Sequence, residues 1–205
     1  LTPGDFEVEH VLPSTDGRQV YFSSNKSDID RRHLWRVAPD VELEALTSGD
    51  GIEWGPAVAA DGRALAFLSS DATTPAHAEV IPEGGTRRPI VPDFIPAQFP
   101  HQELVTPQQV VFESEDLLPI HGQLFLPPGA RLEERRPAVI FFHGGSRRQM
   151  LLGWHYLRYY HNAYALNQYL ASRGYVVLSV NYRSGTGYGM EFREAENYGA
   201  TGASE

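Results

Sequence analysis

The feature that most constrains this chain is a repeat within its first hundred residues. Three segments return at the same offset of 45 residues, so the second copy shows no slippage against the first. The pairs are Leu1–Asp5 with Leu46–Asp50, Asp16–Arg18 with Asp61–Arg63, and Phe22 with Phe67. A period of about 40–45 residues that contains several short strands is typical of the blades of a β-propeller.

Turn and strand signals agree with such blades. Each Asp-Gly pair is favoured in a two-residue hairpin turn, since both central positions can adopt positive φ. Short apolar stretches predict strands at Gln19–Ser23, Leu34–Val37, Ala64–Leu68 and Ala78–Ile81. Two blades cannot close a ring that typically has about 4–8 blades, so we expect further blades in a longer protein. A generic antiparallel meander is the alternative.

Proline punctuates the middle of the chain and predicts a boundary near residue 100. Proline fixes φ and cannot donate a ladder hydrogen bond, which suits an extended crossing between domains. The prolines are Pro89, Pro92, Pro96, Pro100 and Pro107. We therefore predict two incomplete domains, with residues 1–100 as the C-terminal, all-β blades of a propeller and residues 101–205 as a second domain.

Residues 101–205 have the pattern that opens an α/β-hydrolase sheet. Strands are predicted at Gln109–Glu113, Ile120–Leu126, Ala138–His143 and Tyr175–Val180. An apolar stripe at helical spacing precedes the last strand and comprises Tyr159, Ala163, Leu166 and Leu170. Arg173 and Gly174 then form a helix stop. Strand, helix and strand in this order make a parallel crossover, and two strands before it are the N-terminal part of an α/β-hydrolase.

The strand at Ala138–Phe142 is the centre of this second domain. Its five apolar residues lie between Pro137 and a glycine turn, which predicts a strand buried on both faces, as in parallel sheets. In the α/β-hydrolase strand order 1-2-4-3-5, this third strand lies beside Tyr175–Val180. Its other edge then requires a fifth strand, so we expect the rest of the domain to cover it.

The residues His143, Gly144 and Gly145 form a candidate oxyanion turn directly after this strand. Two glycines let the backbone turn sharply and bring N–H groups close to a ligand. In α/β-hydrolases the loop after the third strand supplies an oxyanion-hole N–H. A plain glycine turn is the alternative. Arg147 and Arg148 come next and could hold a substrate carboxylate by bidentate bonds, although a solvated loop is the favoured interpretation.

Two stretches resemble one known family. Trp54–Phe67 resembles the β-propeller repeat of TolB-like proteins, which also builds the propellers of many prolyl-oligopeptidase-family enzymes. Asn181–Gly189 reads NYRSGTGYG and is similar to the NYRGSTGYG segment that follows the fourth strand in that family. With His143 before the two glycines, the chain resembles the acylaminoacyl-peptidase branch, since the dipeptidyl-peptidase-IV branch has tyrosine there. Ser146 departs from the usual His-Gly-Gly-Pro.

The resemblance implies a serine peptidase that acts on short peptides through an acyl-enzyme. A serine attacks the carbonyl, a histidine carries the proton and an aspartate orients the histidine. It also implies that the Gly145 N–H, in one turn with Gly144 and His143, stabilises the oxyanion, and that no cofactor or metal takes part. The Gly-x-Ser-x-Gly elbow of the nucleophile does not occur in the 205 residues. We therefore expect these residues to need the remainder of their own polypeptide and to be inactive alone.

Two other functions remain possible at this point, whereas composition argues against nucleic-acid binding and excludes cysteine chemistry. A His-Gly-Gly esterase and a non-enzymatic TolB-like binding propeller are the alternatives to the peptidase. The net charge of −9 argues against nucleic-acid binding. Without cysteine there is no disulfide, thiolate metal site or cysteine nucleophile.

Membrane and metal signals are also absent from the sequence. No apolar run approaches the ~20 residues of a membrane span. His143, His155 and His161 lack the carboxylate company and the helical spacing of a metal site. The sequence is compatible with an oligomer and with more than one compartment.

Overall fold

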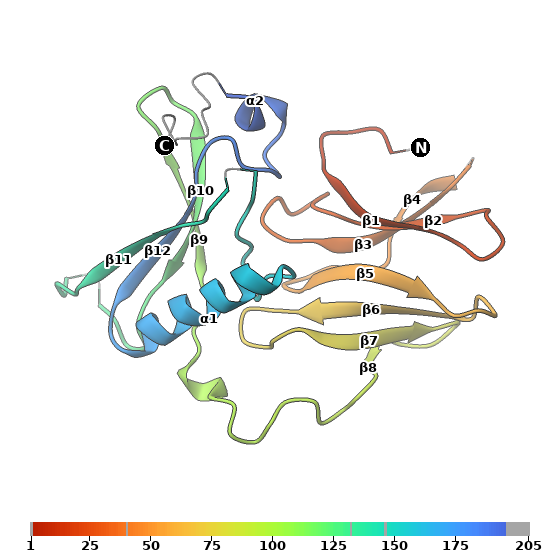
Figure 1. Cartoon of the computed structure of the whole chain (residues 1–205), viewed down its shortest axis with the longest axis horizontal. Helices are drawn as coiled ribbons and strands as arrows, with labels where there is room; N and C mark the ends of the chain where they lie inside the picture. The colour runs from red at the N-terminus through yellow and green to blue at the C-terminus, as the bar shows by residue number, and fades with distance from the viewer. Residues whose placement is uncertain (1, 40, 132, 146, 196–205) are drawn as a thin grey trace. The chain divides into compact units, whose positions relative to one another are not determined.

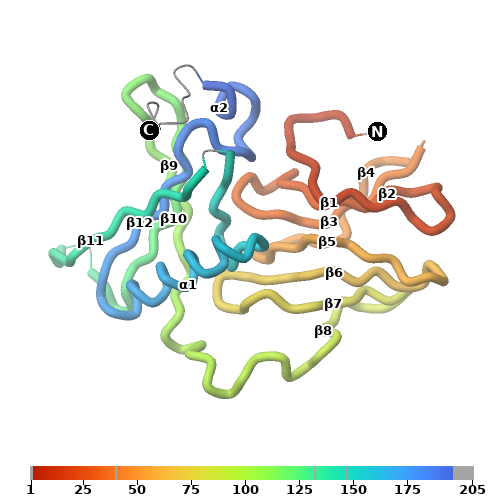
Figure 2. The backbone as a smooth tube through the Cα atoms, in the orientation of Figure 1, coloured from red at the N-terminus to blue at the C-terminus, as the bar shows by residue number. Residues whose placement is uncertain are grey.

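The computed structural model describes residues 2–39, 41–131, 133–145 and 147–195. The chain divides into two compact units, Leu1–Phe99 and Pro100–Glu205, and the connection between them is traced in Figure 2. The described part is mostly β-sheet, with few helices and no closed barrel. None of its helices is long and apolar enough to cross a membrane.

Two four-stranded antiparallel sheets form the first unit (Figure 1). Their strand orders are β1-β2-β3-β4 and β5-β6-β7-β8. The strands are β1 (Val8–Pro13), β2 (Val20–Ser24), β3 (His33–Ala38), β4 (Val41–Ala45), β5 (Ile52–Val58), β6 (Ala64–Ser70), β7 (His77–Pro82) and β8 (Arg88–Pro89). The four strands that the sequence predicts in this unit are confirmed as β2, β3, β6 and β7.

The 45-residue repeat is retained in the backbone of these two sheets. Strand β1 has a bulge against β2, and β5 has a bulge against β6 at the equivalent place. The equivalent bulge residues are His10 and Gly55, whose φ angles are 51° and 61°. The equivalent phenylalanines Phe22 and Phe67 are both buried, and the cluster around Phe67 also includes Leu34 and Tyr21 of the first sheet.

The Asp-Gly turns are longer than the two-residue turns that the sequence predicts. In the first turn, the Ser14 N–H donates to the Gln19 carbonyl at 2.8 Å. Asp16 does not adopt positive φ, and its carboxylate instead accepts the Arg18 N–H at 3.0 Å. Gly17 alone supplies the positive φ, at 69°. The aspartate is therefore selected for its side-chain hydrogen bond, and only the glycine for its backbone freedom.

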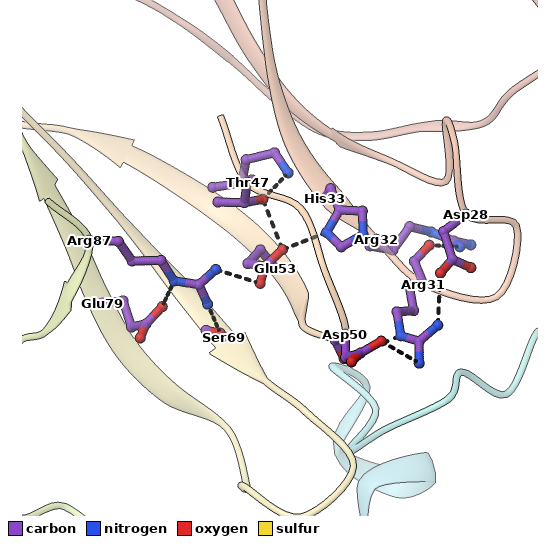
Figure 3. A network of polar contacts seen from close by, with 11 residues as sticks. Asp28, Arg31, Arg32, His33, Thr47, Asp50, Glu53, Ser69, Glu79 and Arg87 are labelled. Atoms are coloured by element: carbon purple, nitrogen blue, oxygen red, sulfur yellow. Dashed lines mark hydrogen bonds and ion pairs between the residues drawn. The ribbon is translucent and has the colours of Figure 1, made fainter. Parts of the chain in front are cut away.

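A buried polar network links the two sheets of the first unit (Figure 3). Glu53 on β5 is fully buried, and its carboxylate lies 2.8 Å from His33 Nδ1 and accepts a 2.8 Å hydrogen bond from Thr47. The Arg87 guanidinium lies 3.0 Å from the other carboxylate oxygen and also pairs with Glu79. Burial of a carboxylate is tolerated only with such partners, so this network fixes how the sheets meet.

The second unit contains one four-stranded sheet, with the order β11-β12-β10-β9. Strands β11 and β12 are parallel, and the other neighbours are antiparallel. The elements are η1 (His101–Glu103), β9 (Gln108–Glu113), β10 (Pro119–Phe125), β11 (Ala138–Phe142), α1 (Arg158–Ser172), β12 (Val176–Asn181) and α2 (Met190–Arg193). The predicted parallel crossover is confirmed. When the four strands are numbered along the chain, their order across the sheet from β9 is first, second, fourth and third.

Strand β11 lies at the edge of this sheet, and its predicted burial on both faces is wrong for the described residues. Val139 and Phe141 are partly buried, and Phe141 packs in the cluster that includes Tyr160 of α1. On the opposite face Ile140 and Phe142 are 58% and 55% exposed. One face of this edge is therefore apolar and uncovered within the part of the chain that the structure describes.

Helix α1 packs through a different face from the apolar stripe that the sequence predicts. Tyr159 and Leu166 are exposed, whereas Ala163 is buried as expected. The buried face also includes Tyr160, Tyr164, Asn167, Gln168 and Ala171. The prediction failed because it treated hydrophobicity as the sole guide, while two aromatic rings and two amides are what the sheet accommodates.

Candidate active site

The turn after β11 contains the three candidate oxyanion residues, His143, Gly144 and Gly145. His143 is buried, whereas Gly144 and Gly145 are exposed. Gly145 has a φ of +54°, a region that favours glycine. Among the described residues, neither the Gly144 N–H nor the Gly145 N–H donates a hydrogen bond. Two backbone donors on adjacent residues thus have no acceptor within the described part of the turn.

Two tyrosine hydroxyls hold the carbonyl groups of the same turn. The Tyr182 hydroxyl donates to the His143 carbonyl at 2.7 Å. The Tyr160 hydroxyl donates to the Gly144 carbonyl, also at 2.7 Å. Tyr160 comes from the first turn of α1 and Tyr182 directly follows β12, so two separate elements fix the turn.

The imidazole of His143 is wedged between the same two tyrosines. It stacks on the Tyr182 ring with a centroid distance of 4.4 Å and meets the Tyr160 ring edge-on at 6.3 Å. Neither ring nitrogen has a hydrogen-bond partner among the described residues. Burial lowers the pKa of His143 to about 4, and the neighbouring Gly144 backbone opposes this only in part. The ring is therefore neutral at pH 7 and acts as a packing group.

The segment Asn181–Gly189 holds the chain that follows the turn. The Met150 N–H donates to the Asn181 side chain at 2.7 Å, and the Asn181 amide donates back to the Met150 carbonyl at 2.9 Å. The Thr186 N–H donates to the Arg148 carbonyl at 3.2 Å. A Cβ on Gly185 would lie only 2.6 Å from that carbonyl oxygen, so this contact needs glycine. The motif thus restrains the residues that directly follow the candidate oxyanion turn.

The two predicted substrate-binding arginines already have protein partners. Arg147 makes a bidentate pair with Glu194, with distances of 2.6 and 2.9 Å, and Arg147 lowers the pKa of Glu194 to about 2. Arg148 donates to the Arg147 carbonyl at 2.8 Å. Both side chains are near the turn in sequence, but these contacts do not orient them toward it. Their role in binding a carboxylate stays a prediction.

The other histidines near the turn have structural contacts. His155 lies with Nε2 2.8 Å from the Gln149 carbonyl and accepts the Leu157 N–H through Nδ1. His161 packs on Trp154 with a centroid distance of 4.7 Å. No group of three potential metal ligands occurs within the described ranges.

Sequence reasoning located the turn but missed the tyrosines that hold it. Tyr182 lies inside the Asn181–Gly189 motif, so its position was visible as part of a family pattern. Tyr160 had no signal beyond its place in an aromatic-rich helix, because a hydroxyl's target depends on tertiary packing.

Comparisons with known proteins agree on one class of enzyme. No family model matches the chain. It is 44% identical over 61 residues to dipeptidyl aminopeptidase BIII of Pseudoxanthomonas mexicana, covering 30% of this chain and 8% of that protein. It is 30% identical over 89 residues to the uncharacterized peptidase YuxL of Bacillus subtilis (strain 168), covering 43% of this chain and 12% of that protein.

A solved structure matches over almost the full chain. It is that of a Mycobacterium tuberculosis puromycin-hydrolyzing peptidase, with a TM-score of 0.73 and 22% sequence identity. The match covers 95% of this chain and 30% of that one, which shows a shared fold. The chain thus spans about a tenth of the length of the two curated relatives. Taken with the two motifs, these likenesses support a peptidase of the prolyl oligopeptidase family.

Proposed function

We propose that the whole protein is a serine peptidase that cleaves short peptides through an acyl-enzyme. In this proposal residues 1–100 are the C-terminal blades of a β-propeller, and residues 101–205 are the N-terminal part of an α/β-hydrolase catalytic domain. The strand order of the second unit supports this assignment, because β9, β10, β12 and β11 follow the order of the first four hydrolase strands.

The observation that carries the proposal is a pair of N–H groups, at the carboxyl end of a parallel strand, that donate no hydrogen bond to any described residue. Ligand sites of open α/β sheets lie at the carboxyl ends of their strands. A tetrahedral intermediate places negative charge on the former carbonyl oxygen, and fixed donors about 3 Å away stabilise it. The Gly145 N–H, with Gly144 beside it, would be one such donor. His143 stands at the position of the tyrosine in the dipeptidyl-peptidase-IV branch.

The remaining chemistry would come from residues outside this chain. The serine would attack the peptide carbonyl and pass its proton to a histidine, which then protonates the leaving amine. Water would attack the acyl-enzyme in a second step. Relatives named as a dipeptidyl aminopeptidase and as a puromycin-hydrolyzing peptidase support an amide substrate at the end of a short chain.

A serine-directed fluorophosphonate probe tests this proposal. It should label the whole protein with one equivalent per chain and leave residues 1–205 unlabelled, because no Gly-x-Ser-x-Gly occurs in them. Loss of hydrolysis of dipeptide p-nitroanilides should follow labelling. Stoichiometric labelling of residues 1–205, or a whole protein that the probe does not modify, would contradict the proposal.

A further inference from the structure

We propose that Tyr160 and Tyr182 are positioning residues that aim the N–H groups of the oxyanion turn. Each tyrosine binds a carbonyl of the turn, and the two carbonyls belong to consecutive residues, His143 and Gly144. The kinetic consequence of this arrangement rests on the proposed peptidase function. The geometric claim stands on the structure of the turn itself.

The geometry follows from the planarity of the peptide group. In a trans peptide the C=O of one residue and the N–H of the next point in opposite directions within one plane. A hydrogen bond to the His143 carbonyl therefore fixes the direction of the Gly144 N–H. In the same way, the bond from Tyr160 to the Gly144 carbonyl fixes the direction of the Gly145 N–H. Each tyrosine thus sets one donor without touching it.

The turn needs such restraint because of its composition. The peptide group between Gly144 and Gly145 has no Cβ on either side, so steric hindrance to its rotation is small. A half-turn of this plane would exchange the N–H for the C=O and present an acceptor to the developing oxyanion. Gly145 also has positive φ, a conformation that glycine leaves readily. The hydrogen bond to the Gly144 carbonyl opposes that rotation directly.

Both hydroxyl groups are themselves held rigidly. Tyr160 is 7% exposed and packs with Met150 and Ala163, while Tyr182 is 6% exposed and stacks on His143. A tyrosine has only two side-chain torsions, and packing fixes both of them here. The two rings come from α1 and from the residue that follows β12. The directions of the Gly144 and Gly145 N–H groups therefore depend on how α1 packs against β12.

The first test is structural and does not depend on activity. Crystal structures of the whole protein would be compared for Y160F, Y182F and the control Y159F. Tyr159 is the neighbour of Tyr160 in the sequence and is 72% exposed. We expect the 144–145 peptide to rotate or to occupy two orientations in Y160F, the 143–144 peptide to do so in Y182F, and both to stay unchanged in Y159F. Unchanged peptide planes in both Y160F and Y182F would overturn the inference. Each variant bears on the claim independently, should the other fail to fold.

The second test separates positioning from general structural support. For a dipeptide p-nitroanilide, kcat should fall between about tenfold and about a hundredfold in Y160F, with KM within about twofold of wild type. The inhibition constant of a peptide aldehyde, which binds as a tetrahedral adduct, should rise by the same factor as kcat falls. Y160F kinetics equal to those of Y159F would contradict the claim. If the wild type hydrolyses nothing, the proposed function fails, and the crystal comparison still decides the geometry.

Discussion

Ser184 carries an unusual combination of strain and burial. Its φ is +76°, it is 1% exposed, and its hydroxyl has no hydrogen-bond partner among the described residues. The family segment NYRGSTGYG has glycine at this place, whereas this chain has the serine first and Gly185 second. This exchange places glycine at position 185, where a Cβ atom would clash with the Arg148 carbonyl oxygen. It also leaves a serine at position 184, in a backbone conformation that favours glycine.

We predict that S184G stabilises the whole protein by about 1 kcal/mol, because a left-handed backbone costs a non-glycine residue about 1–2 kcal/mol. S184A is the matched control, since it removes the buried hydroxyl and keeps the backbone strain. Denaturant midpoints should rise in the order wild type, S184A, S184G. A midpoint for S184G at or below that of S184A would show that the backbone conformation is not under strain.

His143 predicts a pH dependence of stability with a definite sign. Its pKa is about 4 in the folded protein, against 6.5 for an unperturbed histidine. Between these values the unfolded chain binds more protons, so stability is full above pH 6.5 and is lost as the pH falls toward 4. From pH 7 to pH 5 this residue should cost about 2 kcal/mol of stability.

The measurement compares wild type with H143Q, whose side chain does not titrate. Each is unfolded with urea at pH 7 and at pH 5, so that losses common to both proteins cancel. Wild type should lose about 2 kcal/mol more than H143Q over this interval. Equal losses would mean that the imidazole is not buried as the structure has it.

At the scale of secondary-structure elements, the network around Glu53 joins two sheets that share no strand. We predict that E53Q lowers the stability of the first unit by about 2–3 kcal/mol, because it weakens buried hydrogen bonds to charged groups and leaves Arg87 with one carboxylate. E83Q is the control, since it breaks an ion pair with Arg63 whose side chains are 68% and 73% exposed, and it should cost under about 0.5 kcal/mol. Similar shifts in urea midpoint for both variants would refute a structural role for the network.

The elements were predictable where a local pattern determines them. The Asp-Gly signals, the apolar stretches and the Arg173–Gly174 stop gave four strands of the first unit and the crossover of the second. The repeat also predicted equivalent geometry in both copies, and the structure keeps the same bulge even where His10 replaces a glycine. A bulge is set by strand pairing as well as by residue type, so its place could not be read from His10 alone.

Tertiary packing determines the features that the sequence did not predict. The face of α1 against the sheet includes Asn167 and Gln168, and Gln168 exchanges hydrogen bonds with the Val105 backbone, 63 residues away. Similarly, nothing local links Tyr160 to the carbonyl of Gly144. The candidate turn was visible because its glycines follow a strand directly, whereas the groups that hold it come from elements distant in sequence.

For the molecule as a whole, the edge strand β11 matters most. Ile140 and Phe142 leave an apolar face that a hydrolase sheet would cover, and the proposed function implies that further strands and helices do so in the whole protein. The same continuation would bring a nucleophile to the carboxyl end of the sheet, where the turn at His143–Gly145 lies. In this proposal the same part of the polypeptide therefore covers β11 and completes the active site.

A complex with a tetrahedral adduct would show whether the Gly145 N–H binds the oxyanion. The whole protein would be crystallised with a peptide aldehyde or phosphonate bound as a tetrahedral adduct. We predict that the Gly145 nitrogen lies within about 3.1 Å of the adduct oxygen, with the Gly144 carbonyl still bound by Tyr160. A Gly145 N–H that points to solvent or into the sheet, while the adduct oxygen binds other donors, would contradict it.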